Sequence, residues 1–318
     1  MTILRLKSIA FLIISLIWLS ACDQSSSSLK NEEGFIQVKG GRVWYQLIGS
    51  GSKPPIVFLH GGPGIPHYYL KPLAALSVDR PVIFFDQLGC GRSDRITDTS
   101  LMTIPTYVEQ LAQVIQHFNL KEFYLYGHSW GSMLGVDYYQ AHPNGIKGLL
   151  FSGPAFSIPR WKQDADTLLA TLPEATRQII HTNEANNTTD SPAYQQAVMA
   201  YYDRYLTRKK PMSADMDSTF AQIGQNIYLY MCGPSEFTLT GNLKNYEAIE
   251  AIRQIKVPTL LISGEFDEAR PATVAYYESQ IPGARHALIP GAGHLTMQDA
   301  PALELKAITN FLTDIETR

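Results

Sequence analysis

The strongest constraint in this 318-residue chain is the turn Gly127-His128-Ser129-Trp130-Gly131, which follows an apolar run and precedes a helical pattern. The apolar residues 123–126 predict a buried strand, and the residues after Gly131 predict a helix. A turn this tight forces Ser129 into a strained backbone conformation, and small residues on either side let the neighbouring chain pass. The pattern predicts a nucleophile elbow, with a helix N-terminus that offers free N–H groups to a developing negative charge.

A nucleophilic serine needs a base and an acid that orients the base, and candidates for both follow later in the chain. Residues 257–263 predict a buried parallel strand, and Asp267 lies in the loop that leaves its carboxyl end, where α/β sheets place functional groups. His294 lies in a glycine-rich loop after the next predicted strand, so its imidazole can reach toward Ser129. We expect Ser129 to be the nucleophile, Asp267 the acid and His294 the base. His286, inside a strand, is expected to be structural.

Strand and helix patterns alternate along most of the chain. Predicted strands cover a pair within 35–48 joined at Gly40-Gly41, then 55–59, 81–85, 123–126, 146–151, 257–263 and 286–290; predicted helices include 106–120, 271–280 and 300–315. Alternating units predict an α/β fold with a mostly parallel sheet flanked by helices.

The alternation stops between residues 155 and 253, where helical spacing predicts a cap domain inserted over the carboxyl ends of the strands. The predicted core therefore consists of residues 34–154 and 254–318. A tyrosine stripe in the insertion is expected to form the core of the cap rather than a substrate pocket. It comprises Tyr194, Tyr201, Tyr202 and Tyr205.

Composition excludes some classes of function. A net charge of −3 provides no basic surface for nucleic acid, and 45% hydrophobic residues suffice for a large core. Histidine and cysteine lack the spacing of a metal site, so we expect no metal and no cofactor. Cys90 and Cys232 are expected to be separate buried thiols, although an oxidising compartment would permit them to pair.

The N-terminus carries a separate signal. Arg5 and Lys7 precede an apolar run, 9–19, that is too short for a comfortable transmembrane helix, and Leu19-Ser20-Ala21-Cys22 follows. This resembles a bacterial lipoprotein signal, which implies cleavage after residue 21, lipid on Cys22 and a tether over 22–33. Asp23 resembles an inner-membrane retention signal, so we expect a lipid-anchored protein of the cell envelope that faces the periplasm. The alternative is an ordinary secretory signal with an incidental cysteine.

Two glycine-rich loops narrow the chemistry. His60-Gly61-Gly62-Pro63-Gly64 and Asp86-Gln87-Leu88-Gly89-Cys90-Gly91-Arg92-Ser93 each leave a predicted strand. Together with the elbow they resemble the proline iminopeptidase family of α/β-hydrolases, serine peptidases that remove single N-terminal residues. The resemblance runs from about residue 34 to the C-terminus. It implies that the backbone N–H groups of Gly62 and Trp130 form the oxyanion hole.

The resemblance extends into the cap. Gly233-Pro234-Ser235-Glu236-Phe237-Thr238 resembles a segment of the tricorn-interacting aminopeptidases, in which a glutamate holds the substrate amine. A second such glutamate follows the catalytic aspartate in that family and corresponds to Glu268. Holding an ammonium at a fixed distance from the scissile carbonyl requires desolvation and counter-charge, which two carboxylates supply. The alternative for Glu236 is a solvated surface charge. Residues 171–211 match no family motif, so the side-chain pocket stays unassigned.

These observations predict a serine aminopeptidase that releases one N-terminal residue, with proline as a candidate, from short peptides through an acyl-enzyme. An esterase, lactonase or amino-acid amidase could use the same triad, because α/β-hydrolases host many reactions. A third alternative is a non-catalytic binding protein on a hydrolase scaffold. The sequence leaves the oligomeric state open.

We expect Cys22→Ser to abolish fatty-acid labelling and to leave the precursor uncut, because the thiol is the site of lipid attachment. Metabolic labelling followed by gel electrophoresis measures both effects. A truncated variant that begins at Asn31 should keep the catalytic activity, since the tether adds nothing to the predicted site. Lipid that persists on Cys22→Ser would contradict the lipoprotein interpretation.

Overall fold

The computed structural model describes residues 29–317, and a single eight-stranded sheet forms its centre. The strands are ordered β1-β2-β4-β3-β5-β6-β7-β8. β2 is antiparallel to its neighbours β1 and β4, and the other pairs are parallel. The strands are β1 (Glu32–Val38), β2 (Gly41–Ile48), β3 (Ile56–Leu59), β4 (Val82–Phe85), β5 (Phe123–His128), β6 (Ile146–Ser152), β7 (Thr259–Gly264) and β8 (Arg285–Ile289). The predicted α/β fold with a mostly parallel sheet is confirmed.

Helices lie in the connections from β3 to β8, and two more follow β8. They are η1 (His67–Val78), η2 (Thr99–Leu101), α1 (Ile104–His117), α2 (Trp130–Ala141), α3 (Ile158–Leu169), α4 (Glu174–Ala185), α5 (Pro192–Tyr205), α6 (Ala214–Ala221), α7 (Gln225–Met231), α8 (Ile249–Ile252), α9 (Pro271–Gln280), α10 (Thr296–Asp299) and α11 (Pro301–Glu316). The sequence pattern does not indicate η1, because 3₁₀ geometry lacks the 3.6-residue spacing that identifies an α-helix.

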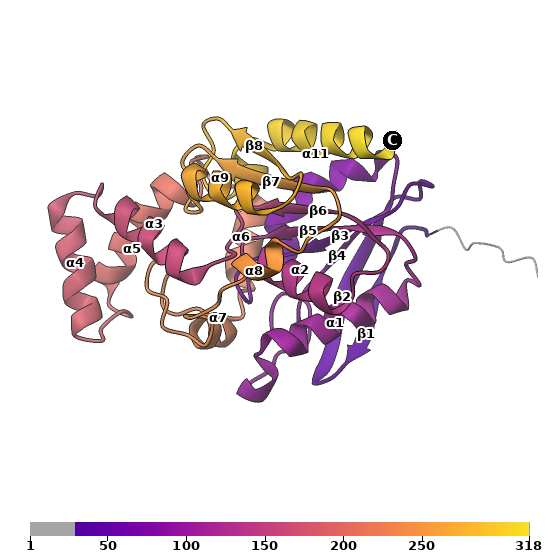
Figure 1. The fold of residues 1–318 in the computed structure, drawn as a ribbon. Helices are drawn as coiled ribbons and strands as arrows, with labels where there is room; N and C mark the ends of the chain where they lie inside the picture. Colours follow the sequence, from indigo (N-terminus) through magenta and orange to yellow (C-terminus); the bar gives the residue numbers. More distant parts are fainter. Residues whose placement is uncertain (1–28, 318) are drawn as a thin grey trace, which may run out of the picture.

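Helices cover both faces of the sheet (Figure 1), and alternate residues of the central strands pack in two different cores. Val57 and Leu59 of β3 pack in one core with side chains of α1, α2 and α9. Ile56 and Phe58 of the same strand pack in a second core with η1, α10 and α11. Because a strand side chain changes face at every residue, a strand buried on both sides must be apolar throughout, as β3 is.

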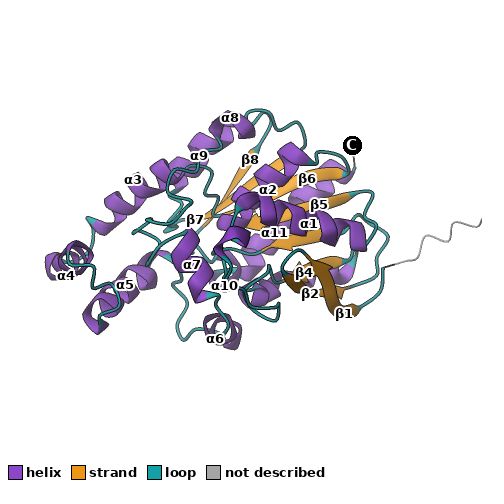
Figure 2. Cartoon of the chain, turned by 90° about the horizontal axis from the view of Figure 1, so that it is seen from below, coloured by secondary structure: helices purple, strands orange, loops and turns teal. Residues whose placement is uncertain are grey.

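The segment between β6 and β7 is helical, and α3, α4 and α5 project beyond one end of the sheet (Figures 1 and 2). These helices have a small core of their own, which includes Tyr194, Tyr201 and Tyr205. Those three tyrosines therefore lie where the sequence analysis expects them. Tyr202 packs against the same core, and its hydroxyl also accepts a hydrogen bond from the backbone N–H of Glu236 at 3.4 Å.

The N-terminal predictions are only partly covered by these residues. The predicted signal peptide 1–21 and Cys22 lie outside the described residues. β1 begins at Glu32, inside the predicted tether 22–33, because Glu32 and Glu33 already pair with Leu47 and Gln46 of β2. Within residues 29–317, no helix is both long and apolar enough to cross a membrane.

Arg80 ties the C-terminal helix to the sheet. Its side chain is only 3% exposed, and its guanidinium donates to both carboxylate oxygens of Glu316, at 2.5 and 3.0 Å, and to Asp79 at 3.1 Å. Burial alone would raise the pKa of Glu316, but hydrogen bonding to Arg80 and its charge hold that pKa below the ordinary value. The pair therefore stabilises the fold when Glu316 is ionised.

We expect Arg80→Ala to lower the free energy of unfolding by about 2–4 kcal/mol, because it removes two hydrogen bonds from a largely buried carboxylate and leaves only Lys53, at 3.4 Å, as its cation. A carboxyl group with a lowered pKa stabilises the fold above its unfolded-state pKa and loses that effect as the pH falls. The difference in free energy of unfolding between the wild type and Arg80→Ala should therefore become smaller below about pH 4. Urea denaturation at several pH values measures it. Lys147→Ala breaks an exposed pair with Glu122 and should cost less than about 1 kcal/mol. Equal losses in both variants would contradict this prediction.

Candidate active site

The turn after β5 has the geometry that the sequence predicts. Ser129 has φ 53° and ψ −119°, and α2 begins at the next residue. A Cβ on Gly131 would collide with the backbone of Leu59 in β3, and a Cβ on Gly127 would collide with the backbone of Gly131. Both positions therefore require glycine, because the neighbouring backbone leaves no room for a Cβ. The turn places Ser129 at the carboxyl end of the sheet, against the helix N-terminus.

Asp267 and His294 meet as predicted. The Nδ1 atom of His294 lies 2.7 Å from Oδ1 of Asp267, and both residues are buried. The carboxylate also accepts the backbone N–H groups of Gly264 at 3.0 Å and Ala269 at 2.8 Å, which fix its orientation. Nε2 of His294 is buried and has no hydrogen-bond partner among the described residues. This nitrogen is therefore available to exchange a proton with a substrate or with Ser129.

A relay that the sequence analysis missed connects the glycine-rich loop, the elbow and the histidine loop. The hydroxyl of Tyr69 accepts the N–H of Gly61 at 2.7 Å, so its own proton goes to Nδ1 of His128 at 2.9 Å. Nε2 of His128 then donates to the backbone oxygen of His294 at 3.1 Å. Burial, with the charge of His294 adding to it, lowers the pKa of His128 well below its ordinary value. A neutral His128 can act as acceptor and donor at once, as this relay requires.

Gln87 forms a second link between the same loops. Its backbone N–H donates to Nε2 of His60 at 2.9 Å, and its side-chain amide donates to the backbone oxygen of His60 at 3.2 Å. The amide oxygen accepts the indole N–H of Trp130 at 2.8 Å. Gln87 therefore holds the loop that carries Gly62 at a fixed distance from Trp130, the residue after Ser129. Gln87 is inside a quoted motif, but no sequence pattern indicates this role.

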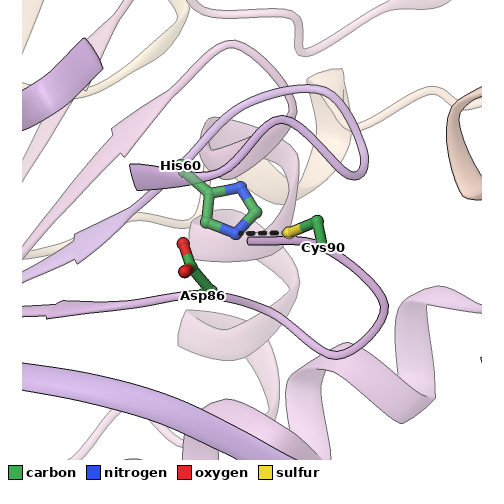
Figure 3. Close-up of side chains that lie close together, drawn as sticks. All are labelled: His60, Asp86 and Cys90. Carbon is green, nitrogen blue, oxygen red and sulfur yellow. Dashed lines mark hydrogen bonds between the residues drawn. The ribbon is translucent and has the colours of Figure 1, made fainter. Parts of the chain in front are cut away.

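His60, Asp86 and Cys90 form a buried cluster beside these loops (Figure 3). Their ligand atoms lie within 4.8 Å of one another, although the sequence shows no metal-site spacing. Each is already engaged in hydrogen bonding: Nε2 of His60 accepts the Gln87 N–H, and both oxygens of Asp86 accept donors from His67 and Arg92. Burial lowers the pKa of His60 to about 4. We therefore interpret the cluster as structural: its hydrogen bonds hold the two loops together.

The two cysteines of the described chain are separate. Cys90 and Cys232 are both buried and free, which agrees with the expectation of unpaired thiols. Burial raises the pKa of each thiol well above its ordinary value, so neither has the character of a reactive thiolate.

Glu236 and Glu268 are both buried close to the triad. The hydroxyl of Tyr228 donates to Oε1 of Glu236 at 2.7 Å, and the indole of Trp161 donates to its backbone oxygen at 2.8 Å. Burial raises the pKa of Glu236, and burial with the charges of Glu236 and Asp267 raises that of Glu268 well above its ordinary value. Glu236 is 9% exposed, which excludes a solvated surface charge. Tyr228 and Trp161 were not identified from sequence, because only the tertiary fold brings them here.

Two hollows open on either side of Ser129, and Glu236 and Gly62 line both. The first, of about 360 Å³, is otherwise lined by Pro63, Trp130, Met133, Ala155, Ile158, Trp161, Cys232, Leu239, Leu243 and Lys244. The second, of about 390 Å³, is otherwise lined by Gly61, Ile65, Tyr69, His128, Leu206, Met216, Thr219, Phe220, His294 and Leu295. Residues 171–211, which match no family motif, contribute only Leu206 to these linings.

Comparison with known proteins agrees with this geometry. A family model described as the alpha/beta hydrolase fold matches residues 54–301. A proline iminopeptidase of Heyndrickxia coagulans is 41% identical, over 89% of this chain and 99% of the relative. The chain belongs to the proline iminopeptidase family. It is a serine hydrolase of the exopeptidase type found in that family.

Solved structures support the same membership. The crystal structure of proline iminopeptidase from Mycobacterium smegmatis has a TM-score of 0.83 and 30% identity, over 90% of this chain and 99% of that one. The crystal structure of VinJ has a TM-score of 0.86 and 31% identity, over 89% of this chain and 99% of the other. The likeness therefore includes the helical insertion as well as the sheet.

We expect Ser129→Ala and His294→Ala each to lower kcat by about four to six orders of magnitude, because triad members act as a unit. Active-site serine labelling should be lost in Ser129→Ala. His286→Ala is the matched control: His286 lies in β8, and its Nε2 contacts the hydroxyl of Ser263 at 2.8 Å, away from the triad. Near-normal turnover in Ser129→Ala, or an equal loss in His286→Ala, would contradict the assignment.

Proposed function

We propose that this protein is an aminopeptidase that releases one N-terminal residue from short peptides through an acyl-enzyme on Ser129. In the proposed mechanism, Nε2 of His294 takes the proton of Ser129 as its Oγ attacks the scissile carbonyl. Asp267 holds the imidazole in the required tautomer. The leaving peptide nitrogen then receives that proton, and a water molecule hydrolyses the ester to regenerate the free serine.

The oxyanion of the tetrahedral intermediate is assigned to backbone donors. Trp130 is the first residue of α2, so its N–H has no carbonyl partner within the helix. Gly62 lines both hollows beside Ser129, and its φ of 114° is a conformation that glycine adopts readily. Such preorganised donors stabilise the transition state more than the ground state, because the negative charge develops only during the reaction.

The observation that carries the aminopeptidase proposal is the state of Glu268. Its carboxylate is 1% exposed, and neither oxygen has a hydrogen-bond partner within residues 29–317. A buried charge without a partner is costly unless a counter-charge fills the site. The ammonium group of a substrate N-terminus supplies that charge. An ammonium substrate therefore explains why two carboxylates, those of Glu236 and Glu268, are buried next to a serine triad. A simple ester carries no such charge and does not explain them.

The first hollow is assigned to the side chain of the N-terminal residue. Met133, Ile158 and Trp161 give it an apolar wall, and Glu236 lies at the side shared with Ser129. A compact apolar ring fits such a wall while its imino nitrogen remains beside the carboxylate of Glu236. The relatives named as proline iminopeptidases support proline as this residue.

We also propose that the protein is a lipid-anchored component of the bacterial cell envelope, with the catalytic domain facing the periplasm. The support is the N-terminal signal pattern that ends at Cys22. β1 begins at Glu32, so a short linker separates the proposed lipid from the sheet. Such an anchor would retain the enzyme at the membrane where short peptides cross the envelope.

We expect Glu236→Gln and Glu268→Gln each to lower kcat/KM for free-amine substrates by about ten- to a thousandfold, because each variant removes one charge from the ammonium contact. Kinetics with Pro and Ala arylamides measure the effect, and thermal unfolding verifies the fold. Hydrolysis of simple esters should be spared. N-acetylation of the substrate should lower kcat/KM of the wild type by a similar factor. It should lower kcat/KM of the variants much less, because each variant has already lost one charge of the ammonium contact.

The pH profile provides a second readout of the same contact. On the acid side, protonation of the base His294 lowers kcat/KM for every substrate, so the readout is kcat/KM for free-amine substrates divided by that for simple esters. This ratio should fall as the carboxylates protonate, at a higher pH than the ordinary glutamate pKa of about 4.3, since burial raises both pKa values. On the alkaline side it should fall as the substrate amine, with a pKa of about 8, loses its proton. A wild-type enzyme that cleaves N-acetylated and free-amine substrates equally well would favour an esterase or amidase instead.

A further inference from the structure

The second hollow lies on the histidine side of Ser129. His294 and its neighbour Leu295 line it, whereas neither contributes to the first hollow. In serine-hydrolase chemistry, the protonated base gives its proton to the leaving group. The leaving group must therefore lie on the side of His294. If the N-terminal residue occupies the first hollow, the rest of the peptide leaves through the second.

Apart from Ser129, His294 and the Tyr69–His128 relay, the side chains that line the second hollow are apolar, with the exceptions of Thr219 and the shared Glu236. Five of its side chains are hydrocarbon, thioether or aromatic groups: Ile65, Leu206, Met216, Phe220 and Leu295. No lysine or arginine is among its lining residues, and the one carboxylate there is Glu236, which it shares with the first hollow. An acidic side chain entering it would lose hydration, would find no lysine or arginine, and would meet the like charge of Glu236.

Helix α6 supplies one wall of this hollow and is fixed in place. Met216 is 2% exposed and belongs to the core formed with η1 and α11. Asp215 pairs with Lys71 of η1 at 3.5 Å. Phe220, on the same helix, lines the hollow but is 43% exposed. A preformed apolar wall with one accessible aromatic ring is suited to a side chain that arrives from solvent.

We propose that the second hollow binds the second residue of the peptide substrate and selects apolar side chains there, with Phe220 as a specificity-determining residue. This inference rests on the proposed aminopeptidase function and deepens it. The enzyme would then release the N-terminal residue fastest from peptides with leucine or phenylalanine in second position and slowest from those with an acidic second residue.

The experiment uses peptide amides with N-terminal proline followed by Leu, Gly or Asp, so that no terminal carboxylate differs between substrates. The wild type should favour Leu over Gly by about tenfold or more in kcat/KM, as expected for burying one apolar side chain. The Asp peptide should be the poorest substrate. Each peptide is also measured in its N-acetylated form.

Phe220→Lys should reduce the preference for Leu and improve cleavage of the Asp peptide by about three- to fivefold, the gain of a partly exposed ion pair. Leu229→Lys is the matched control. Leu229 is on α7, is 47% exposed and lines neither hollow, so the variant adds the same charge without changing second-residue preference. Because both positions are well exposed, both variants should fold.

Lys244→Gln tests the opposite placement, because Lys244 lines the first hollow. If Lys244→Gln changes the second-residue preference and Phe220→Lys does not, the leaving peptide occupies the first hollow and the inference is overturned. Free-amine peptides cleaved at equal rates whatever their second residue would also overturn it, with the aminopeptidase function intact. Equal cleavage of N-acetylated and free peptides would instead refute the proposed function itself.

Discussion

The close backbone contact between the elbow and β3 is the constraint on which the site depends. Gly131 at the start of α2 lies against the carbonyl of Leu59, with no room for a Cβ. This approach brings the helix N-terminus over the end of the sheet and holds Ser129 at φ 53°. Strain of this kind persists only where the surrounding structure fixes it. Here the apolar strands β3 and β5, paired in parallel, provide that rigidity.

Two hydrogen-bond links extend this rigidity to the rest of the catalytic group. The Tyr69–His128 relay fixes the glycine-rich loop and the histidine loop relative to the elbow, and Gln87 fixes the same loop relative to Trp130. Every member is buried and nearly all of their polar atoms are paired, which is the condition under which a buried polar network specifies one geometry. The proposed oxyanion donors, Gly62 and Trp130, are thus positioned before any substrate arrives.

The buried carboxylates Glu236 and Glu268 have a different origin. They come from the helical insertion and from the loop after β7, and the fold brings them together beside the triad. Neither oxygen of Glu268 has a hydrogen-bond partner within residues 29–317, whereas Glu236 accepts one from Tyr228, and both are proposed to bind the substrate ammonium. The cap therefore both shields the triad from water and creates the low-dielectric surroundings in which an ammonium contact is strong.

The sequence alone determined the α/β fold, the elbow and the positions of Asp267 and His294, because strand periodicity, glycine spacing and strand-end loops are local signals. It did not predict η1, whose 3₁₀ spacing is not helical. Nor could it predict that the hydroxyl of Tyr202 contacts Glu236 while Tyr202 packs against the tyrosine core, or that His60, Asp86 and Cys90 cluster. Those contacts join segments far apart in the chain. Only tertiary packing decides them, because burial and partner choice depend on which surfaces meet.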